Sequence, residues 1–385
     1  MNSDMIFKHA RLVLGDEVVE GTLAVSGGHI AAIATGGSGV PAAEDIDGDF
    51  LIPGLVELHT DNFERHLMPR PKVRWPVLPA LLAHDAELAA SGITTVYDSL
   101  GVGDIDEEAL RGQDWGEVVA SIESAGEADL LRVEHLLHVR CELAAANTLQ
   151  LFEPFLDNPR VGLISLMDHT PGQRQWEDLE QARIYYTGKK GWSDAKFAAQ
   201  VESAKVVQER YAAPHRRHFV AYARQRGIVL ASHDDTLAEH VHEGHRDGVV
   251  ICEFPTRVAC AQLARDLGQS VLMGAPNVVR GGSHSGNVAA IELAKLGVLD
   301  TLSSDYIPVS LLMAAFRLVD DAGFTIPQAM ATVTRNPARS VGLLDRGEIA
   351  PGKRADLVQV RLVAGLGGRR QPVIRAVWRA GRRVI

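Results

Sequence analysis

The sequence is poor in cysteine. Its three cysteines, Cys141, Cys252 and Cys260, are odd in number and show no Cys-x-x-Cys spacing, which argues against a disulfide framework and against a thiolate zinc site. Positive charge is also scarce, since 39 Lys and Arg stand against 49 Asp and Glu, a formal net charge of -10. Such a chain has no general attraction for nucleic acid or anionic membranes, so an anionic ligand must be held by a local basic cluster.

Long hydrophobic runs are missing as well. No segment reaches the roughly 18 uninterrupted apolar residues that a membrane span needs. The first 30 residues carry no basic stretch followed by an apolar core, as a signal peptide would. We therefore expect a cytoplasmic protein with no membrane or nucleic-acid partner. The sequence leaves open whether the chain forms a homo-oligomer.

The chain does have enough apolar material for a large core, with 385 residues of which 46% are hydrophobic. This length predicts one large domain plus a small one. Residues 1–52 contain short apolar runs broken by Gly-Asp and Gly-Gly pairs, which are typical of β-hairpins. Residues 346–385 show the same pattern of short apolar runs broken by turn residues. We predict that the two termini together form a small β-sandwich domain.

Residues 53–345 show a different pattern. A strand-like apolar run followed by a helical stretch recurs about eight times, which is typical of a parallel sheet with crossover helices. We predict an α/β fold, a (β/α)8 TIM-type barrel, whose catalytic residues sit at the C-terminal ends of the strands. The strands are expected to end near His59, Leu100, Glu142, His169, His233, Phe254, Asn277 and Asp305. The long connection from Thr170 to Arg226 predicts an excursion over the active-site mouth.

The first barrel strand, Leu51 to Asp61, ends in polar residues. Strand alternation places Glu57, His59 and Asp61 on one face. His59 and Asp61 can therefore chelate one metal ion. A lone His-x-Asp pair is usually incidental. This pair, however, lies at the junction between the N-terminal β unit and the barrel, which favours a metal site.

The third strand, Arg132 to Glu142, alternates polar residues on one face, among them Glu134, His138 and Arg140. Inward polar side chains need partners. One interpretation is a set of buried ion pairs. The other makes Glu142, last in the strand, a metal ligand, with Arg140 one pleat deeper or facing the substrate.

Three more strands end in possible ligands. His169 follows the fourth strand, His233 ends the fifth and Asp305 follows the eighth. Either histidine by itself is better explained as a structural residue. Together with the first and third strands, however, five of the eight strands end in His, Asp or Glu. This is more than the composition of solvent-exposed loops would give. Imidazole combined with carboxylate suits zinc or manganese.

Two further groups of residues suit a polyanion. One lies on a proline-rich loop directly after the first strand, and the other follows the seventh strand. They are Arg65, His66, Arg70, Lys72 and Arg74 in the first group, and Arg280, Gly281, Gly282, Ser283 and His284 in the second. A solvated loop face is the alternative for the first group, but its place at the barrel rim favours anion binding. Backbone amides of the glycine turn could also cradle a phosphate.

Over its whole length the sequence resembles the amidohydrolase superfamily, and within it the PhnM family of the bacterial carbon–phosphorus lyase pathway. The motifs that carry this resemblance are Gly54 to His66, His138 to Glu142, Met167 to Gln173, Ser232 to Asp235 and Gly274 to Ser283. The resemblance implies a β-sandwich joined to a barrel that holds one or two divalent metal ions, zinc first, with manganese or iron as alternatives. It also implies hydrolysis of α-D-ribose 1-methylphosphonate 5-triphosphate to the 5-phosphate and pyrophosphate.

The resemblance implies roles for single residues too. Members of the superfamily commonly carry His-x-His on the first strand and a carboxylated lysine on the fourth, where this chain has His59-x-Asp61 and a histidine. Glu142 would replace the bridging lysine. Asp305 matches the eighth-strand aspartate that accepts a proton from the attacking water. The expected metal ligands are His59, Asp61, Glu142, His169, His233 and Asp305.

Two other functions stay open at this point. The same fold could act as an amidase, lactamase or deaminase on a cyclic amide or amine, which explains the metal ligands but not the basic rim. A non-catalytic barrel scaffold is the second alternative, and the presence of every expected ligand speaks against it. Release of pyrophosphate would indicate the diphosphatase, whereas release of ammonia or an amine would indicate the amidase or deaminase. Absence of bound metal would favour the non-catalytic scaffold.

Overall fold

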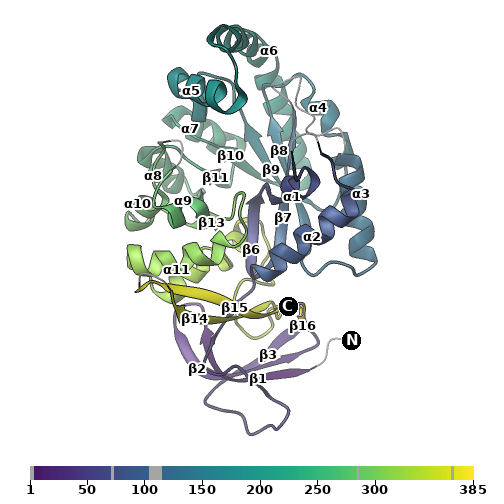
Figure 1. The fold of residues 1–385 in the computed structure, drawn as a ribbon, viewed down its shortest axis with the longest axis vertical. Helices are drawn as coiled ribbons and strands as arrows, with labels where there is room; N and C mark the ends of the chain where they lie inside the picture. The colour runs from purple at the N-terminus through teal and green to yellow at the C-terminus, as the bar shows by residue number, and fades with distance from the viewer. Residues whose placement is uncertain (1–3, 71–72, 104–114, 284–285, 366–367) are drawn as a thin grey trace.

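The structure of the chain, a computed structural model, describes residues 4–70, 73–103, 115–283, 286–365 and 368–385. It is built around two eight-stranded sheets. In Figure 1 the strands of both termini form the lower part of the molecule, and the parallel strands with their helices form the upper part. The predicted fold class, a barrel with a β unit from both termini, is confirmed.

The lower sheet joins the two ends of the chain. Its strands are β1 (Met5–Val13), β2 (Val18–Ser26), β3 (His29–Thr35), β4 (Glu44–Asp45), β5 (Phe50–Pro53), β14 (Leu357–Ala364), β15 (Arg370–Arg379) and β16 (Arg382–Arg383). They follow the order β16-β15-β14-β5-β1-β2-β3, with β4 beside β1. Phe7 of β1 meets Trp378 of β15, with ring centroids 4.9 Å apart. Because these buried rings come from opposite ends of the chain, neither end could bury its apolar face alone.

The upper sheet is the barrel. Its strands are β6 (Leu55–Thr60), β7 (Ile93–Val102), β8 (Glu134–Glu142), β9 (Val161–Met167), β10 (Val229–His233), β11 (Ile251–Glu253), β12 (Ser270–Gly274) and β13 (Thr301–Ser303). Neighbouring strands pair in parallel in chain order. Each strand ends within three residues of the position predicted from the sequence. The parallel arrangement brings all the strand ends to one rim.

The barrel closes where β13 meets β6. The backbone N–H of Asp305 donates to the carbonyl of His59 (3.0 Å), and the N–H of Asp61 donates to the carbonyl of Asp305 (2.8 Å). These two bonds form a parallel bridge between Thr60 and Asp305. The last strand is therefore fastened to the first through residues that the sequence predicts as metal ligands.

Deeper in the barrel, β6 and β13 are joined through the segment that follows α12 (Ile326–Ala331). The N–H of Val56 donates to the carbonyl of Val333, and the N–H of Leu302 donates to the carbonyl of Thr332, both at 2.9 Å. This segment takes the place of direct pairing between the two strands.

Helices follow most of the barrel strands and pack outside them (Figure 1). Besides α12 they are α1 (Asn62–Leu67), α2 (Val77–Ala90), α3 (Trp115–Glu127), α4 (Thr148–Leu151), α7 (Ala238–Asp247), α8 (Val258–Asp266), α9 (Ala275–Arg280), α10 (Ala290–Lys295), α11 (Ser310–Ala322) and α13 (Arg335–Ser340), with a 3₁₀ turn at Glu153–Phe155. In the part of the chain that the structure describes, none of the helices combines the length and the apolar character that a bilayer crossing requires.

The long connection between β9 and β10 forms a helical excursion. It contains a 3₁₀ turn at Arg174–Trp176, then α5 (Leu179–Lys190) and α6 (Asp194–Arg226). Ser193 caps α6 by accepting from the N–H of Lys196, and Gly227 ends it in the left-handed conformation (φ 67°). Gln208 of α6 donates to the carboxylate of Asp168 at 3.0 Å. The excursion is thereby tied to the strand ends at the barrel rim.

Gly54 lies where the terminal sheet passes into the barrel, and a side chain does not fit there. A Cβ on Gly54 would lie 2.2 Å from Thr94 Oγ1 and 2.9 Å from Asp356 Cβ. Overpacking of this kind costs about 1–3 kcal/mol, so Gly54→Ala should lower the free energy of unfolding by that amount in chemical denaturation. Gly116→Ala is the control, because a Cβ at Gly116 meets nothing within 4 Å. Equal stability of the two variants would contradict the prediction.

Candidate metal centre

A cavity of about 540 Å³ opens at the C-terminal ends of the barrel strands. Its wall takes residues from the ends of β6, β8, β10 and β12 and from the loops after β9, β11 and β13. The lining residues include His59, Arg140, His169, Gln175, His233, Asp234, Phe254, Asn277, Arg280, Gly282, Ser283, Asn287, Asp305 and Tyr306. Gln175 belongs to the excursion between β9 and β10, so this segment contributes to the cavity wall.

One group of donor atoms comes from the closing bridge of the barrel. The ligand atoms of His59, Asp61 and Asp305 lie within 4.8 Å of one another. Asp305 adopts a left-handed backbone (φ 56°) directly after β13, and residues of this kind occur where function requires an unusual side-chain direction. Burial raises the pKa of Asp305, and the nearby Asp61 raises it further.

A second group lies beside the first. It consists of His169, His233 and Asp234, whose donor atoms also lie within 4.8 Å of one another. The carboxylate of Asp234 is 3.5 Å from Nε2 of His233 and 3.9 Å from Nε2 of His169. Asp234 again has a left-handed backbone (φ 54°). The two groups face each other, since the rings of His59 and His233 stack with centroids 5.7 Å apart.

Glu253, at the end of β11, lies beneath both groups. Its carboxylate accepts from Nδ1 of His59 (3.1 Å), from Nδ1 of His233 (3.2 Å) and from the hydroxyl of Ser165 (2.6 Å). Because a carboxylate only accepts, both histidines carry the proton on Nδ1. Their Nε2 atoms are left as ligands toward the cavity, which is the usual way in which an outer carboxylate orients a metal-binding histidine.

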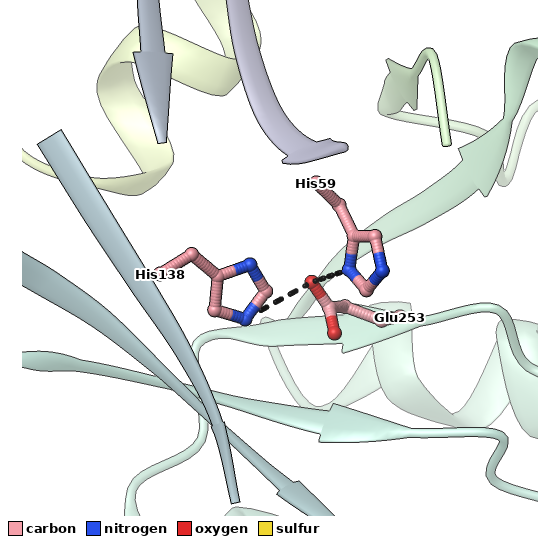
Figure 2. Close-up of side chains that lie close together, drawn as sticks. All are labelled: His59, His138 and Glu253. Carbon is pink, nitrogen blue, oxygen red and sulfur yellow. Dashed lines mark hydrogen bonds and ion pairs between the residues drawn. The ribbon is translucent and has the colours of Figure 1, made fainter. Parts of the chain in front are cut away.

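His138 of β8 flanks the same carboxylate. Figure 2 shows Glu253 with His59 on one side and His138 on the other, the latter with Nε2 3.9 Å from the carboxylate. These three residues also form a group of donor atoms within 4.8 Å. Burial lowers the pKa of His138 to about 3, so its ring is neutral. Since Glu253 already accepts from the cavity histidines, this third group supports the other two from below.

Arg140 adds a positive charge to the cavity wall. Its guanidinium donates to Oδ1 of Asp61 at 2.5 Å. Burial works against the charge, but Asp61 and other nearby carboxylates raise the pKa of Arg140 overall, so the side chain stays cationic. Its Nε atom has no hydrogen-bond partner among the described residues. Arg140 also lines the cavity, and the expectation that it faces the substrate stays a prediction.

The second predicted basic group reaches the cavity in part. Arg280, in the last turn of α9, and Gly282 and Ser283, just beyond it, line the wall. Gly281 ends α9 in the left-handed conformation (φ 85°), which turns the chain toward the cavity. His284 lies outside the described residues.

The first predicted basic group lies around the rim instead. Arg65 donates to Asn62 and to the carbonyl of Tyr306, and His66 pairs with Glu87 at 2.9 Å. Arg70 and Arg74 lie further out on the loop, where Arg74 pairs with Glu117 at 3.2 Å. Lys72 lies outside the described residues. The described side chains in this group are not among those that line the cavity.

Glu142, at the end of β8, contacts a cavity histidine. One carboxylate oxygen accepts the backbone N–H of His169 (3.1 Å), and the other accepts from Nδ1 of the same residue (2.6 Å). Glu142 thus fixes the ring of His169 with Nε2 toward the cavity. The expectation that Glu142 itself binds metal stays a prediction.

Asp234, Glu253 and His138 have no site role in the sequence-based prediction. Asp234 was visible as the residue after a candidate ligand, but strand alternation points it away from the cavity, and only its left-handed backbone brings it in. Glu253 and His138 both lie on strands. Their polar character inside an otherwise apolar barrel was the available signal.

Glu253→Gln should weaken metal binding. The amide presents a donor to one of the two imidazoles, so one histidine loses the acceptor that holds its tautomer. Changes of this kind typically cost about 10- to 100-fold in metal affinity, and competition with a chelator of known affinity measures the loss. Glu117→Gln, at an exposed position on α3, is the control. Unchanged affinity in Glu253→Gln would contradict the role given to this carboxylate.

Comparison with known proteins is decisive for the family. A family model described as the amidohydrolase family matches residues 195–385. The Escherichia coli (strain K12) protein named alpha-D-ribose 1-methylphosphonate 5-triphosphate diphosphatase is 49% identical over 384 residues, which span 99% of this chain and 100% of that protein. The chain belongs to the amidohydrolase family. It is a relative of this diphosphatase within the family.

Other similar proteins are more distant. An adenine deaminase from Nitratidesulfovibrio vulgaris is 24% identical over 391 residues, covering 99% of this chain but 57% of the deaminase. Among solved structures, N-acetyl-D-glucosamine-6-phosphate deacetylase from Mycobacterium smegmatis superposes with a TM-score of 0.62 at 18% identity, covering 99% of this chain and 100% of the deacetylase. At this identity the similarity supports the fold alone.

Proposed function

We propose that the chain hydrolyses α-D-ribose 1-methylphosphonate 5-triphosphate to α-D-ribose 1-methylphosphonate 5-phosphate and pyrophosphate. The relative in E. coli carries the name of this activity. The observation that carries the proposal to this chain is the wall of the cavity, where two groups of His and Asp donors stand with Arg140 and Arg280. A triphosphate needs both charge neutralisation and a hydrolytic centre, and this cavity supplies residues for each.

The two donor groups would hold one or two divalent ions, with zinc as the first candidate and manganese or iron as alternatives. Imidazole and carboxylate ligands suit these ions, and the hydrogen bonds of Glu253 and Glu142 leave the Nε2 atoms of the histidines toward the cavity. A bound divalent ion supplies a Lewis acid and lowers the pKa of a coordinated water. Glu142 would join the ligands if it replaces the bridging lysine.

Asp305 takes the proton from the attacking water in this proposal. Water oxygen bonds to the α-phosphorus, the bond from this phosphorus to the bridging oxygen breaks, and pyrophosphate leaves. A carboxylate fixed beside the attacking water can accept its proton in the transition state. Arg140 and Arg280, which line the cavity, stabilise the charge that develops on the phosphoryl oxygens.

The rim residues Arg65, Arg70 and Arg74 act at longer range. They lie outside the cavity wall, so their contribution is a local positive field on a protein whose net charge is -10. Such a field raises the rate at which an anionic substrate arrives and weakens with added salt. We infer a cytoplasmic location, since the substrate is a phosphorylated metabolite.

The test is product analysis with the purified, metal-loaded protein. Incubation with α-D-ribose 1-methylphosphonate 5-triphosphate should release pyrophosphate and no orthophosphate in the first turnovers. Adenine and cyclic amides, tested in parallel, should release no ammonia or free amine. Ammonia release without pyrophosphate release would overturn the proposal in favour of the deaminase alternative.

A further inference from the structure

A second polar cluster is buried outside the cavity. It joins His84 of α2, Asp98 of β7 and His135 of β8, and all three side chains are fully buried. Asp98 Oδ1 lies 2.8 Å from Nε2 of His84, and Oδ2 lies 2.7 Å from Nδ1 of His135. None of the three lines the cavity. Burying this much charge is costly unless every group has a partner, so the cluster calls for an explanation.

The donor and the acceptor of each hydrogen bond in the cluster can be assigned. Asp98 is an acceptor, so Nε2 of His84 and Nδ1 of His135 both donate to it. Nε2 of His135 points to Asp85, 3.4 Å away. His135 therefore carries two protons between two carboxylates. His84, having given its one proton to Asp98, offers Nδ1 as an acceptor to the side-chain amide of Asn62, 3.1 Å away.

Because Nδ1 of His84 is an acceptor, the orientation of the Asn62 amide is fixed. Its nitrogen donates to Nδ1 of His84 and to the carboxylate of Glu87 (2.9 Å). Its oxygen is left to accept from Arg65 (3.1 Å). The same guanidinium nitrogen of Arg65 donates to the carbonyl of Tyr306 (3.1 Å). Tyr306 lines the cavity and directly follows Asp305 in the chain.

We propose that His84, Asp98 and His135 form a positioning relay, which acts through Asn62 and Arg65 to hold the loop of Asp305 and Tyr306 in place. The relay touches neither substrate nor metal in this arrangement. Its kinetic consequence rests on the proposed function, because it concerns the group that takes the proton from water. Its proton arrangement does not depend on that function.

The titration of the two histidines agrees with this arrangement. Burial opposes the charge of His135, but Asp98 and Asp85 raise its pKa to about 9. Burial lowers the pKa of His84. One imidazole is thus charged at neutral pH while the other is neutral.

The same three residues could instead hold a metal ion, since their donor atoms lie within 4.8 Å of one another. The relay accounts for the short distances without an ion, because each of the two contacts to Asp98 is at hydrogen-bond length and has a donor and an acceptor. The two interpretations differ in whether protons occupy these nitrogen atoms, which a spectrum shows.

The first test is a ¹⁵N spectrum of the wild-type holoenzyme with labelled histidine, assigned with His84→Gln and His135→Gln. We expect His84 as the neutral form with its proton on Nε2 and His135 as the doubly protonated form near pH 7. Metal analysis of His84→Gln should give the wild-type metal content. Loss of one equivalent of metal in His84→Gln, or a wild-type His84 with its proton on Nδ1, would overturn the relay.

The second test follows the relay to the cavity. In Asp98→Asn the side-chain oxygen keeps the charged His135 as donor, so the amide nitrogen must face His84. The proton of His84 then moves to Nδ1, Asn62 must turn over, and Arg65 loses the side-chain oxygen of Asn62 as an acceptor and keeps only the carbonyl of Tyr306. Arg65→Met breaks the final link while leaving the protons of the cluster unchanged. Each variant should lower kcat by about 10- to 100-fold, as a misplaced reacting group does. KM should change little in Asp98→Asn, which leaves the charge of Arg65 in place.

A double-mutant cycle separates positioning from simple destabilisation. If Asp98 and Arg65 act through one link, the variant Asp98→Asn/Arg65→Met should have a kcat within about twofold of the more impaired single variant. His215→Gln is the control for a buried histidine, because His215 of α6 bonds to the carbonyl of Leu143, away from the relay. Additive losses, or an equal loss in His215→Gln, would overturn the proposal. If no variant, wild type included, releases pyrophosphate, the proposed function fails while the spectrum still decides on the relay.

Discussion

Replacing Asp305 by Asn is expected to lower kcat for pyrophosphate release by about 10²- to 10⁴-fold, the usual contribution of a positioned general base. The amide has nearly the same shape as the carboxylate but cannot take a proton from water. Its backbone bridge to His59 and Asp61 uses main-chain atoms only, so the barrel should close as before. Steady-state kinetics measures the loss.

Metal content is the control for this variant. His59 and Asp61 remain in the first donor group, and the second group is untouched, so bound metal should stay close to the wild-type amount under saturating conditions. Near-wild-type turnover in Asp305→Asn would remove this residue from the mechanism. Loss of metal together with activity would assign Asp305 to binding rather than to proton transfer.

Replacing Arg280 by Gln should lower kcat/KM by about 10²- to 10³-fold, the effect of removing one fixed donor from a developing charge. Arg280 lies in the last turn of α9 and lines the cavity wall with an exposed side chain. Glutamine keeps a polar side chain but removes the charge that a triphosphate requires. Inhibition by inorganic tripolyphosphate should weaken in the same variant, since this inhibitor shares only the phosphate chain.

Arg246→Gln is the matched control, because it makes the same change at an exposed position on α7. A general effect of net charge would lower kcat/KM equally in both variants. Equal losses, or an unchanged Arg280→Gln, would show that the cavity does not bind the phosphates through this residue.

The fold could be predicted from the sequence because strand-like runs followed by helical stretches recur along residues 53–345, and several of these strands stop at a polar residue. The end of β10 at His233 and that of β8 at Glu142 are the clearest cases. The terminal sheet could be predicted from the short apolar runs, broken by turn residues, at both ends of the chain. Its strand order could not, because the pairing of β5 with both β1 and β14 depends on contacts between distant segments that carry no local signal.

The site was predictable in its donors and less so in its basic residues. His59, His169, His233 and Asp305 all line one cavity, because parallel strands bring their ends together. Arg65 looked like a substrate contact, since the sequence shows its charge but not Asn62 and Tyr306, which bind it. Partner choice of this kind is set by tertiary geometry.

The way in which the barrel closes has a thermodynamic consequence. Along β6 and β13 the direct main-chain bonds lie at the rim, between Asp305 and the residues on either side of Thr60. An ion held by the side chains of His59, Asp61 and Asp305 would bind the closed ring and not the opened one. Occupancy of the centre is then linked to global stability, in proportion to the logarithm of free ion concentration over its dissociation constant. When the ion is withdrawn, β6 and β13 would separate first. Removal of the ion would then abolish turnover and lower the stability of the fold at the same place, the bridge between these two strands.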